Sequence, residues 1–371
     1  MSTEAFDVSP ALSSHNLEVA PAAHHPALLS GVNFQVFPGR LHGLAGPNGC
    51  GKTTLISTLA GFRKPRAGNV RLAHRDIRSV HPTDRARSIA VVLTERTDTA
   101  FLHVDELVAL GRLPFNPGAK LRKIDQEICA DAMARMGLAH LRRRRVATLS
   151  DGERQRALIA RAIAQAPSVL LLDEPTAHLD VAGEVDIISH LLSIAREDNI
   201  AVLASSHKLQ LMLSWCDSLS LIHPDGALVT GIPEELALAG EVSRTFDTPT
   251  VRFNPVDLRF NSCRSRAWWF PVEVSAEGDY GIWTRRAMER LGFIEKPGAP
   301  LKVSVTHGEH GMTWRIIGAL PSNNAATPNG VAERKRGVSE DQQIDQRFNS
   351  LTELVKFLET FTPRRTLPPG A

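Results

Sequence analysis

One short stretch of this chain predicts its fold most strongly: Gly46-Pro-Asn-Gly-Cys-Gly51-Lys52-Thr53. It fits the pattern G-x-x-x-x-G-K-[ST], and it follows the apolar run Leu41-His-Gly-Leu-Ala45 and precedes an amphipathic segment. With a strand before it and a helix after it, this pattern forms a phosphate-binding loop, because its glycines let backbone N–H groups converge on phosphate oxygens. The stretch therefore predicts a nucleotide-binding α/β domain.

The side chains of the loop supply the chemistry that phosphate binding needs. Lys52 offers a compact positive charge to the β- and γ-phosphates, and the Thr53 hydroxyl can ligate Mg²⁺. The helix that follows adds the positive end of its dipole. The residues expected to bind the nucleotide here are Gly46, Pro47, Asn48, Gly49, Cys50, Gly51, Lys52, Thr53 and Thr54.

Outward from the loop, short apolar runs alternate with amphipathic stretches over roughly the first 250 residues, which is typical of α/β layers. We expect strands at Leu41–Ala45, Ile89–Leu93, Val169–Leu172 and Ala201–Ala204, and helices beginning near Lys52, Gly152, Val181 and Lys208. Between about 95 and 150 helical spacing replaces the strand pattern, which predicts an inserted helical subdomain. The basic run Arg142–Arg145 near its end indicates a solvated helix end.

Two carboxylates follow one of these strands. The run Ser168-Val-Leu-Leu-Leu172 is apolar, as expected of a parallel strand covered on both faces, and Asp173 and Glu174 come directly after it. Ligands of open α/β sheets bind at this end of the strands. We expect Asp173 to hold Mg²⁺ and Glu174 to deprotonate the water that attacks the γ-phosphorus, so ATP hydrolysis is the leading activity.

A further motif, Leu149-Ser150-Asp151-Gly152-Glu153, stands directly before a helix. Here the chain resembles the ATP-binding cassette (ABC) family, whose signature is LSGGQ-like. The order of motifs matches as well: phosphate loop, helical insertion, signature, acidic strand, then Leu179-Asp180 and the switch histidine His207. The resemblance covers roughly residues 14–250 and implies an α/β fold of the P-loop NTPase (ABC ATPase) type, with the helical subdomain at about 95–150.

The resemblance also implies a homodimer. In this family the phosphate loop of one subunit faces the signature of the other, and this chain has one of each. Ser150, Gly152 and Glu153 would contact ATP held by the partner chain, and Asp180 would lie at the dimer interface. His207 would contact the γ-phosphate and the attacking water, beside the general base.

Three positions depart from the pattern of the family. Glu95 takes the place of a glutamine and would act in catalysis and Mg²⁺ binding, although it alters the charge beside the γ-phosphate. No Tyr or Phe follows the first strand to stack on adenine, so either His24 or His25 stacks there or the segment is a plain loop. Asp151 and Glu153 replace the commoner Gly and Gln of the signature.

The segment Val104-Asp-Glu-Leu-Val-Ala-Leu-Gly111-Arg112-Leu-Pro114 looks like one that faces the membrane partner in iron–siderophore, haem and cobalamin importers. Its apolar spacing also fits an ordinary core helix. The importer group implies separate integral-membrane permease subunits, a periplasmic or extracellular solute-binding protein, and a place on the cytoplasmic face of the membrane. The alternatives are a cassette ATPase of another transporter subfamily, a soluble non-transport ABC ATPase, and a nucleotide-binding regulator with little turnover.

The composition of the chain excludes several classes of protein. With 43% apolar and 22% charged residues the chain of 371 residues is not disordered as a whole, and no apolar run of about 18 residues spans a bilayer. The N-terminus lacks the pattern of a secretory signal. Four cysteines without a CxxC pair fit free thiols in a reducing cytosol. The net charge of +3 does not indicate nucleic acid as a partner.

A second unit, a small α+β accessory domain of unknown role, is expected at 264–362. Its predicted elements are strands at 268–274, 301–305 and 312–317, a helix at Tyr280–Leu291, a polar loop over 321–346 and a last helix capped by Ser350 and Glu353. His307-Gly-Glu-His310 offers fewer ligands than a four-ligand metal site, so we read it as a hairpin turn.

Overall fold

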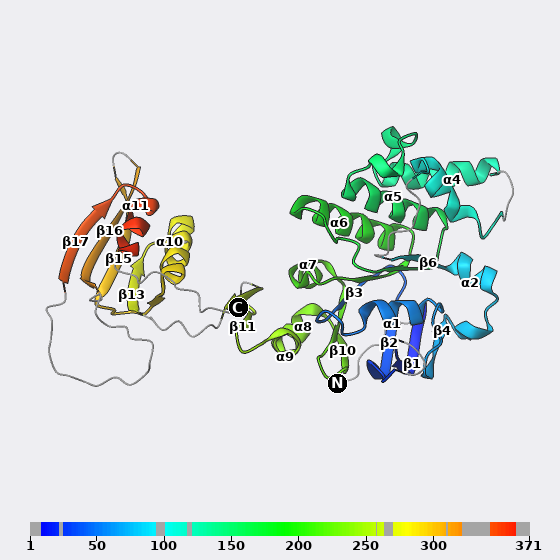
Figure 1. Cartoon of the computed structure of the whole chain (residues 1–371), viewed down its shortest axis with the longest axis horizontal. Helices are drawn as coiled ribbons and strands as arrows, with labels where there is room; N and C mark the ends of the chain where they lie inside the picture. The colour runs from blue at the N-terminus through cyan, green and yellow to red at the C-terminus, as the bar shows by residue number, and fades with distance from the viewer. Residues whose placement is uncertain are drawn as a thin grey trace. The chain divides into compact units, whose positions relative to one another are not determined.

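The fold is described from a computed structural model that covers residues 9–21, 25–93, 101–116, 121–256, 258–262, 270–308, 311–320 and 342–360. The chain forms two compact units, Met1–Ser262 and Cys263–Ala371, shown in Figure 1. Within the described residues no helix has both the length and the apolar character needed to cross a membrane.

A six-stranded sheet forms the centre of the first unit, in the order β10-β9-β3-β8-β7-β6. Its strands are β3 (Leu41–Ala45), β6 (Ile89–Val92), β7 (Val169–Leu172), β8 (Ala201–Ser205), β9 (Ser218–Ile222) and β10 (Leu228–Gly231). All neighbouring pairs are parallel except β9 and β10. The four predicted strands are confirmed, because continuous apolar runs mark strands that are buried on both faces.

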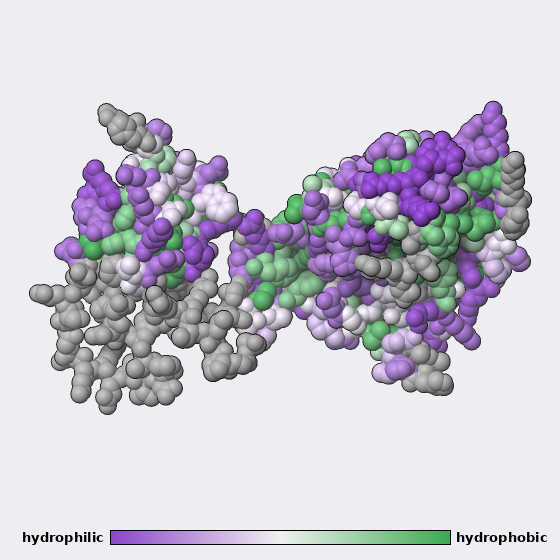
Figure 2. Space-filling model, turned by 45° about the horizontal axis from the view of Figure 1, so that its top comes forward, coloured by the Kyte–Doolittle hydropathy of each residue, from purple (hydrophilic) through white to green (hydrophobic). Residues whose placement is uncertain are grey.

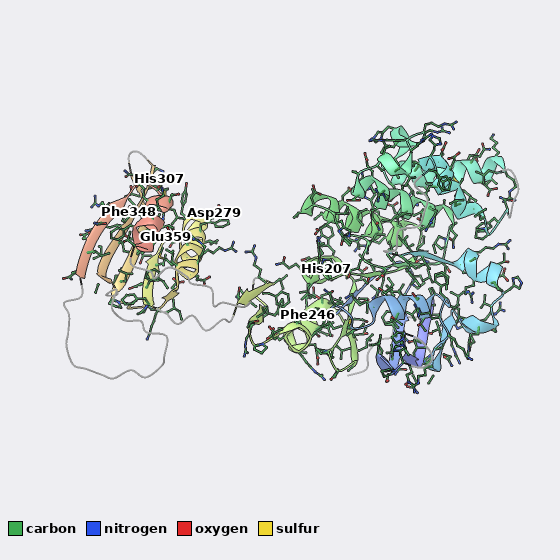
Figure 3. The ribbon with its side chains drawn as sticks, in the orientation of Figure 1. His207, Phe246, Asp279, His307, Phe348 and Glu359 are labelled. Atoms are coloured by element: carbon green, nitrogen blue, oxygen red, sulfur yellow. The ribbon has the colours of Figure 1, made fainter. Side chains whose placement is uncertain are left out.

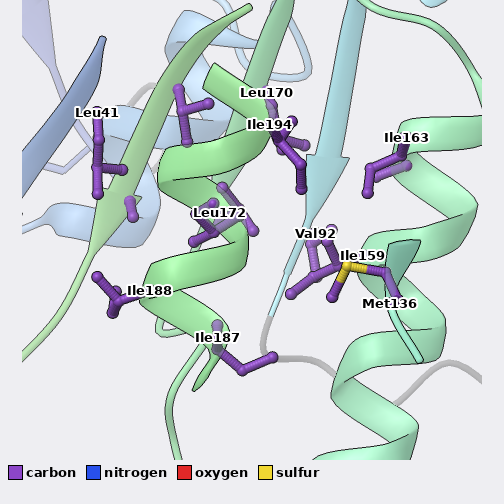
Figure 4. Close-up of a cluster of buried hydrophobic side chains, with 14 of the residues drawn as sticks. Leu41, Val92, Met136, Ile159, Ile163, Leu170, Leu172, Ile187, Ile188 and Ile194 are labelled. Carbon is purple, nitrogen blue, oxygen red and sulfur yellow. The ribbon is translucent and has the colours of Figure 1, made fainter. Parts of the chain in front are cut away.

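The two faces of this sheet belong to two different cores. Leu170 and Leu172 point to one side, where α5 (Asp151–Ala164), α6 (Val181–Glu197) and α7 (Leu209–Trp215) pack (Figures 1 and 4). Val169 and Leu171 point to the other side, where α1 (Lys52–Leu59) and a second sheet lie. The alternation follows from the two-residue period of a strand, and it fixes the register of β7.

The second sheet is antiparallel, in the order β2-β1-β4-β5. It consists of β1 (Leu12–Val19), β2 (Leu29–Val36), β4 (Ala67–Leu72) and β5 (Arg75–Asp76), followed by η1 (Ile77–Ser79) and α2 (Pro82–Ser88). Leu12, Leu17 and Phe34 are fully buried between this sheet and α1. The first unit ends with α8 (Pro233–Leu238), α9 (Glu241–Phe246) and the hairpin of β11 (Val251–Asn254) and β12 (Arg259–Ser262).

Short helices lie between β6 and β7, as predicted for the inserted subdomain. They are α3 (Val104–Ala109), η2 (Leu110–Arg112), α4 (Lys123–Arg135), η3 (Ala139–Leu141) and η4 (Val146–Thr148). The basic run is exposed, and Arg142 and Arg143 lie 3.8 and 3.6 Å from a carboxylate oxygen of Asp105. Figure 2 shows hydrophilic side chains gathered over this part of the molecule.

The importer-like segment 104–114 has both buried and exposed apolar residues. Val104, Leu107 and Val108 are fully buried, whereas Leu110 and Leu113 are 36% and 50% exposed. Arg112 is also buried, and it donates to Asp125 Oδ1 and to the Ala164 carbonyl, each at 2.9 Å. The arginine of this motif therefore ties η2 to α4 and α5, and its guanidinium is not on the surface.

In its described residues, the second unit is a five-stranded sheet, in the order β14-β13-β15-β16-β17, with two helices. Its elements are β13 (Phe270–Ser275), α10 (Gly278–Leu291), β14 (Phe293–Glu295), β15 (Leu301–Gly308), β16 (Gly311–Leu320), β17 (Gln342–Phe348) and α11 (Leu351–Glu359). Its core contains Trp314, Ile316, Leu354 and Leu358.

One prediction for this unit was wrong. The polar stretch 321–346 is expected to be a loop; residues 321–341 lie outside the described part of the chain, and those from Gln342 onward form β17, which pairs antiparallel with β16. β17 is an edge strand with mostly exposed polar side chains, so it lacks the apolar pattern that marks a buried strand. The capped last helix is confirmed: Ser350 Oγ accepts from the Glu353 N–H at 3.2 Å, while the Glu353 carboxylate accepts from the Asn349 N–H at 2.9 Å.

Candidate active site

The sheet order brings three predicted motifs to one edge. The phosphate loop follows β3, Asp173 and Glu174 follow β7, and His207 follows β8, which lies between β3 and β7. Because these strands are parallel, their carboxyl ends meet at the same edge of the sheet. Motifs that lie as much as 160 residues apart in sequence therefore share one site.

The backbone of the phosphate loop has the conformation that its glycines predict. Gly49 and Gly51 have φ values of +79° and +105°, which side-chain-bearing residues rarely adopt. A Cβ on Gly46 would lie 2.8 Å from Cys50 Sγ and 2.9 Å from the Ile222 carbonyl oxygen. Burial raises the pKa of the Cys50 thiol, so this side chain stays protonated and uncharged beside the loop.

Lys52 is folded back onto the loop that precedes it. It is 8% exposed, and its Nζ donates to the carbonyls of Gly46 and Pro47 at 3.0 and 3.3 Å. Glu174 Oε1 lies 4.0 Å from the same Nζ. The ammonium is therefore held at the mouth of the loop, where nucleotide phosphates would replace carbonyl contacts with stronger charged ones.

Asp173 is held on both of its carboxylate oxygens. The Thr53 hydroxyl donates to Oδ2 at 2.6 Å, and the Ser205 hydroxyl donates to Oδ1 at 2.7 Å. Thr53 and Asp173 thus place two oxygen donors side by side, which is the ligand chemistry that Mg²⁺ prefers.

Ser205 is the site residue that the sequence analysis missed. It is fully buried, and besides its bond to Asp173 it accepts from the Glu174 N–H at 3.0 Å. Its position two residues before the switch histidine, at the end of a strand next to the acidic strand, is the signal that could have identified it.

Glu174 connects the acidic strand end with the switch histidine. Its Oε2 lies 2.7 Å from His207 Nδ1 and accepts from the His207 N–H at 3.2 Å (Figure 3 labels His207). Its backbone has a φ of +51°, an uncommon value for a residue with a side chain. Glu174 is half-buried and His207 is exposed, so this pair lies at the surface.

The signature residues lie apart from this cluster. Ser150 caps α5: its hydroxyl accepts from the Glu153 N–H at 3.2 Å, and Glu153 Oε2 accepts from the Ser150 N–H at 2.8 Å. The pKa of Glu153 is lowered, chiefly because its carboxylate accepts the hydrogen bond from the Ser150 N–H. Asp180 caps α6 by accepting from the Gly183 N–H at 2.8 Å.

The signature and the loop with Asp180 are neighbours of each other, since a Cβ on Gly152 would lie 3.7 Å from a methyl carbon of Leu179. Within the described part of the chain, no hydrogen bond or ion pair joins Ser150, Gly152, Glu153 or Asp180 to the phosphate loop. Ser150 and Asp180 are exposed. The described bonds therefore connect the phosphate loop with the acidic strand end and His207, and they do not include the signature.

The predicted role of Glu95 lies outside the described residues, and the predicted adenine contact of His24 or His25 lies partly outside them. Glu95 and His24 are among the residues that the structure does not describe. His25 is described, and its carbonyl accepts from Arg66 Nη1 at 3.3 Å. Arg63 Nη1 likewise donates to the Pro21 carbonyl at 2.5 Å, so two arginines contact the described residues on either side of 22–24.

Comparison with known proteins decides the family. The ABC transporter family matches residues 29–177. An uncharacterized ABC transporter ATP-binding protein of Methanocaldococcus jannaschii is 33% identical over 246 residues, which cover 66% of this chain and 84% of that protein. This chain belongs to the ABC transporter ATP-binding proteins. The resemblance found in the sequence is confirmed, and the chain is an ATPase of the ABC type.

Other ABC relatives are named for what they transport. The ferric enterobactin transport ATP-binding protein FepC of Escherichia coli is 35% identical over 216 residues, 58% of this chain and 80% of that protein. The hemin import ATP-binding protein HmuV of Gloeobacter violaceus is 37% identical over 215 residues, 56% of this chain and 77% of that protein. Among solved structures, cbiO1 of Clostridium perfringens, part of the ABC transporter complex cbiONQ, has a TM-score of 0.56 at 26% identity, covering 64% of this chain and 94% of that one.

The second unit of this ABC protein also has relatives. Residues 270–327 match the iron ABC transporter C-terminal domain. The match covers part of the second unit, which runs from Cys263 to Ala371.

Proposed function

We propose that this protein is the ATP-hydrolysing subunit of an importer for a ligand of the iron–siderophore, haem or cobalamin type, working with separate permease subunits at the cytoplasmic face of the membrane. Support comes from the relatives named for ferric enterobactin and hemin transport. The match of the second unit to a domain of iron transporters favours iron-containing ligands.

The catalytic unit in this proposal is a homodimer with two composite sites. The observation that carries it is that no hydrogen bond or ion pair of the described residues joins the signature to the phosphate loop of its own chain. Ser150 and Asp180 are exposed, and Gly152 and Glu153 are half-buried, so a second subunit could present its nucleotide to them. ATP buried between the subunits would then hold the dimer closed, and hydrolysis would let it open.

Within each composite site, Lys52 binds the β- and γ-phosphates, and Glu174 accepts the proton of the attacking water. His207 orients that water and the γ-phosphate, and its contact with Glu174 at 2.7 Å supports a shared task for the two groups. Thr53 and Asp173 would hold Mg²⁺, which neutralises phosphate charge when it is bound; Glu95 is proposed as a further ligand and catalytic group.

Mixing two inactive variants tests the composite site. Lys52→Ala removes a phosphate contact, and Ser150→Ala removes the signature hydroxyl, so each variant alone has two defective sites. A mixed dimer has one site with both defects and one site with neither. We therefore expect a mixture to hydrolyse ATP faster than the sum of its parts. A mixture with no gain, together with full activity of a monomer, would mean that each chain holds a complete site.

The transport role is tested separately, with the permease from the same genome. The purified complex, reconstituted with its solute-binding protein, should raise its ATPase rate with a ferric siderophore, haem or cobalamin and not with an amino acid or a sugar. Failure to co-purify with any permease, alongside normal ATPase activity, would favour a non-transport ABC ATPase.

A further inference from the structure

The second unit contains a hollow of its own. It is lined by Asp279, Tyr280, Trp283, Trp314 and Leu351, and its volume is about 370 Å³. These residues come from the start of α10, from β16 and from the first turn of α11, and Figure 3 labels Asp279 on α10. A concave site with mostly apolar walls and one charged group has the composition of small-molecule sites.

The deeper wall of the hollow is fixed before any ligand arrives. Trp314 is buried, and its Nε1 donates to Thr284 Oγ1 at 2.9 Å. The ring of Tyr280 meets the Trp314 ring edge to face, with centroids 5.9 Å apart and an interplanar angle of 61°. A preformed aromatic wall loses little conformational freedom when a ligand binds.

The packing of the second unit does not require the rings of Tyr280 and Trp283 at the rim of the hollow. Tyr280 and Trp283 are 50% and 58% exposed, while α10 buries other positions, Ala287 and Met288 among them, against the sheet. Large aromatic side chains left in water at a hollow gain free energy when a ligand covers them. These two rings are therefore the part of the surface that a ligand would cover.

Charge selects the class of ligand. Asp279 forms no ion pair with another described residue, whereas the adjacent cation Arg285 is neutralised by Glu295 at 2.9 Å. The guanidinium carbon of Arg286 lies 5.0 Å from the centroid of the Trp283 ring, so this ring already attracts a cation. We infer that the hollow binds an organic cation that carries a methylated ammonium group, with its charge against the rings and Asp279.

Tyr280 makes this inference testable in the full-length protein, because it is the only tyrosine of the chain. Incorporation of 3-fluorotyrosine gives a single fluorine NMR signal that reports on the hollow. We expect choline to shift this signal saturably, and its neutral isostere 3,3-dimethylbutan-1-ol to bind at least about tenfold more weakly. Equal binding of the two compounds, or no shift with either, would overturn the inference.

Variants locate the site and separate charge from apolar contact. Trp283→Leu and Asp279→Asn should each weaken choline binding about fivefold or more, and Arg286→Gln, which removes a competing cation, should strengthen it. Trp215→Leu, at an exposed tryptophan of the first unit, is the control and should change nothing. If Asp279→Asn and Arg286→Gln leave binding unchanged, or if the signal depends on protein concentration and not on choline, the hollow is an apolar contact surface and not a cation site.

Discussion

The hydroxyl of Ser205 donates a hydrogen bond of 2.7 Å to Asp173 Oδ1. The Ser205 hydroxyl oxygen also accepts from the Glu174 N–H at 3.0 Å, so one side chain on β8 holds both acidic residues at the end of β7. Two groups with different proposed tasks, metal binding and proton transfer, thus depend on one buried neighbour.

Ser205→Ala should lower both stability and activity. It removes the hydroxyl that bonds to Asp173 and to the Glu174 N–H, and the loss of these bonds costs about 1–3 kcal/mol of the free energy of unfolding. Urea denaturation measures this loss, and a Mg²⁺ titration of the ATPase rate should shift to higher concentration. Ser205→Thr should restore much of both. Ser206→Ala is the matched control, since the hydroxyl of this buried serine accepts from the Lys208 N–H instead.

Glu174→Gln should keep ATP binding and lose hydrolysis, because the amide cannot accept a proton at neutral pH. The rate should fall by about 10²–10⁴-fold, the usual contribution of a general base. Size-exclusion chromatography with ATP should then show a trapped dimer. Glu197→Gln, on the exposed end of α6, serves as the control. Undiminished single-turnover hydrolysis would remove Glu174 from the role of the base.

Lys52→Ala should weaken nucleotide binding itself. Loss of a charged contact to phosphate costs about 1.5–3 kcal/mol of binding free energy, which isothermal titration calorimetry with ATP would detect. Lys123→Ala, at a fully solvated lysine of α4, should leave the affinity unchanged. An ATP affinity of Lys52→Ala equal to that of the unaltered protein would contradict the assignment of the phosphate loop.

His42 should make the folded protein sensitive to acid. Burial lowers its pKa from 6.5 to about 3, and its ring nitrogens lie 2.8 and 2.7 Å from the hydroxyls of Ser220 and Ser218. The unfolded chain therefore binds a proton at a higher pH than the folded chain does. The contribution of neutral His42 to the free energy of unfolding is fully present above pH 6.5. It is lost as the pH falls toward 3, and the free energy of unfolding then changes by up to about 1.4 kcal/mol per pH unit.

Urea denaturation between pH 7 and 5 measures this slope, above the range where most carboxylates titrate. His42→Gln should flatten it, whatever its effect on stability at pH 7. His74→Gln, at an exposed histidine, should leave the slope as it is. Equal slopes for the two variants would show that His42 does not bind its proton in this range.

Local patterns explain why so much of the fold could be predicted. The apolar run before Asp173 marks a buried strand by itself, and the caps at Ser150 and Ser350 follow from residues three apart. Ser205 could not be found in this way, because its bonds cross from β8 to β7. β17 was missed because an edge strand covered by water needs no apolar face. Pairing between strands, which is set by tertiary structure, decides both of these cases.

Since β8 separates the strand of the phosphate loop from that of Asp173 and Glu174, the two strands lie two steps of about 4.8 Å apart, and the side chains of Lys52 and Glu174 reach across β8 to within 4.0 Å of each other. The helices from Val104 to Thr148 can therefore vary in length without changing this strand spacing, whereas Glu95, the signature and α5, which packs on the sheet, must keep their places.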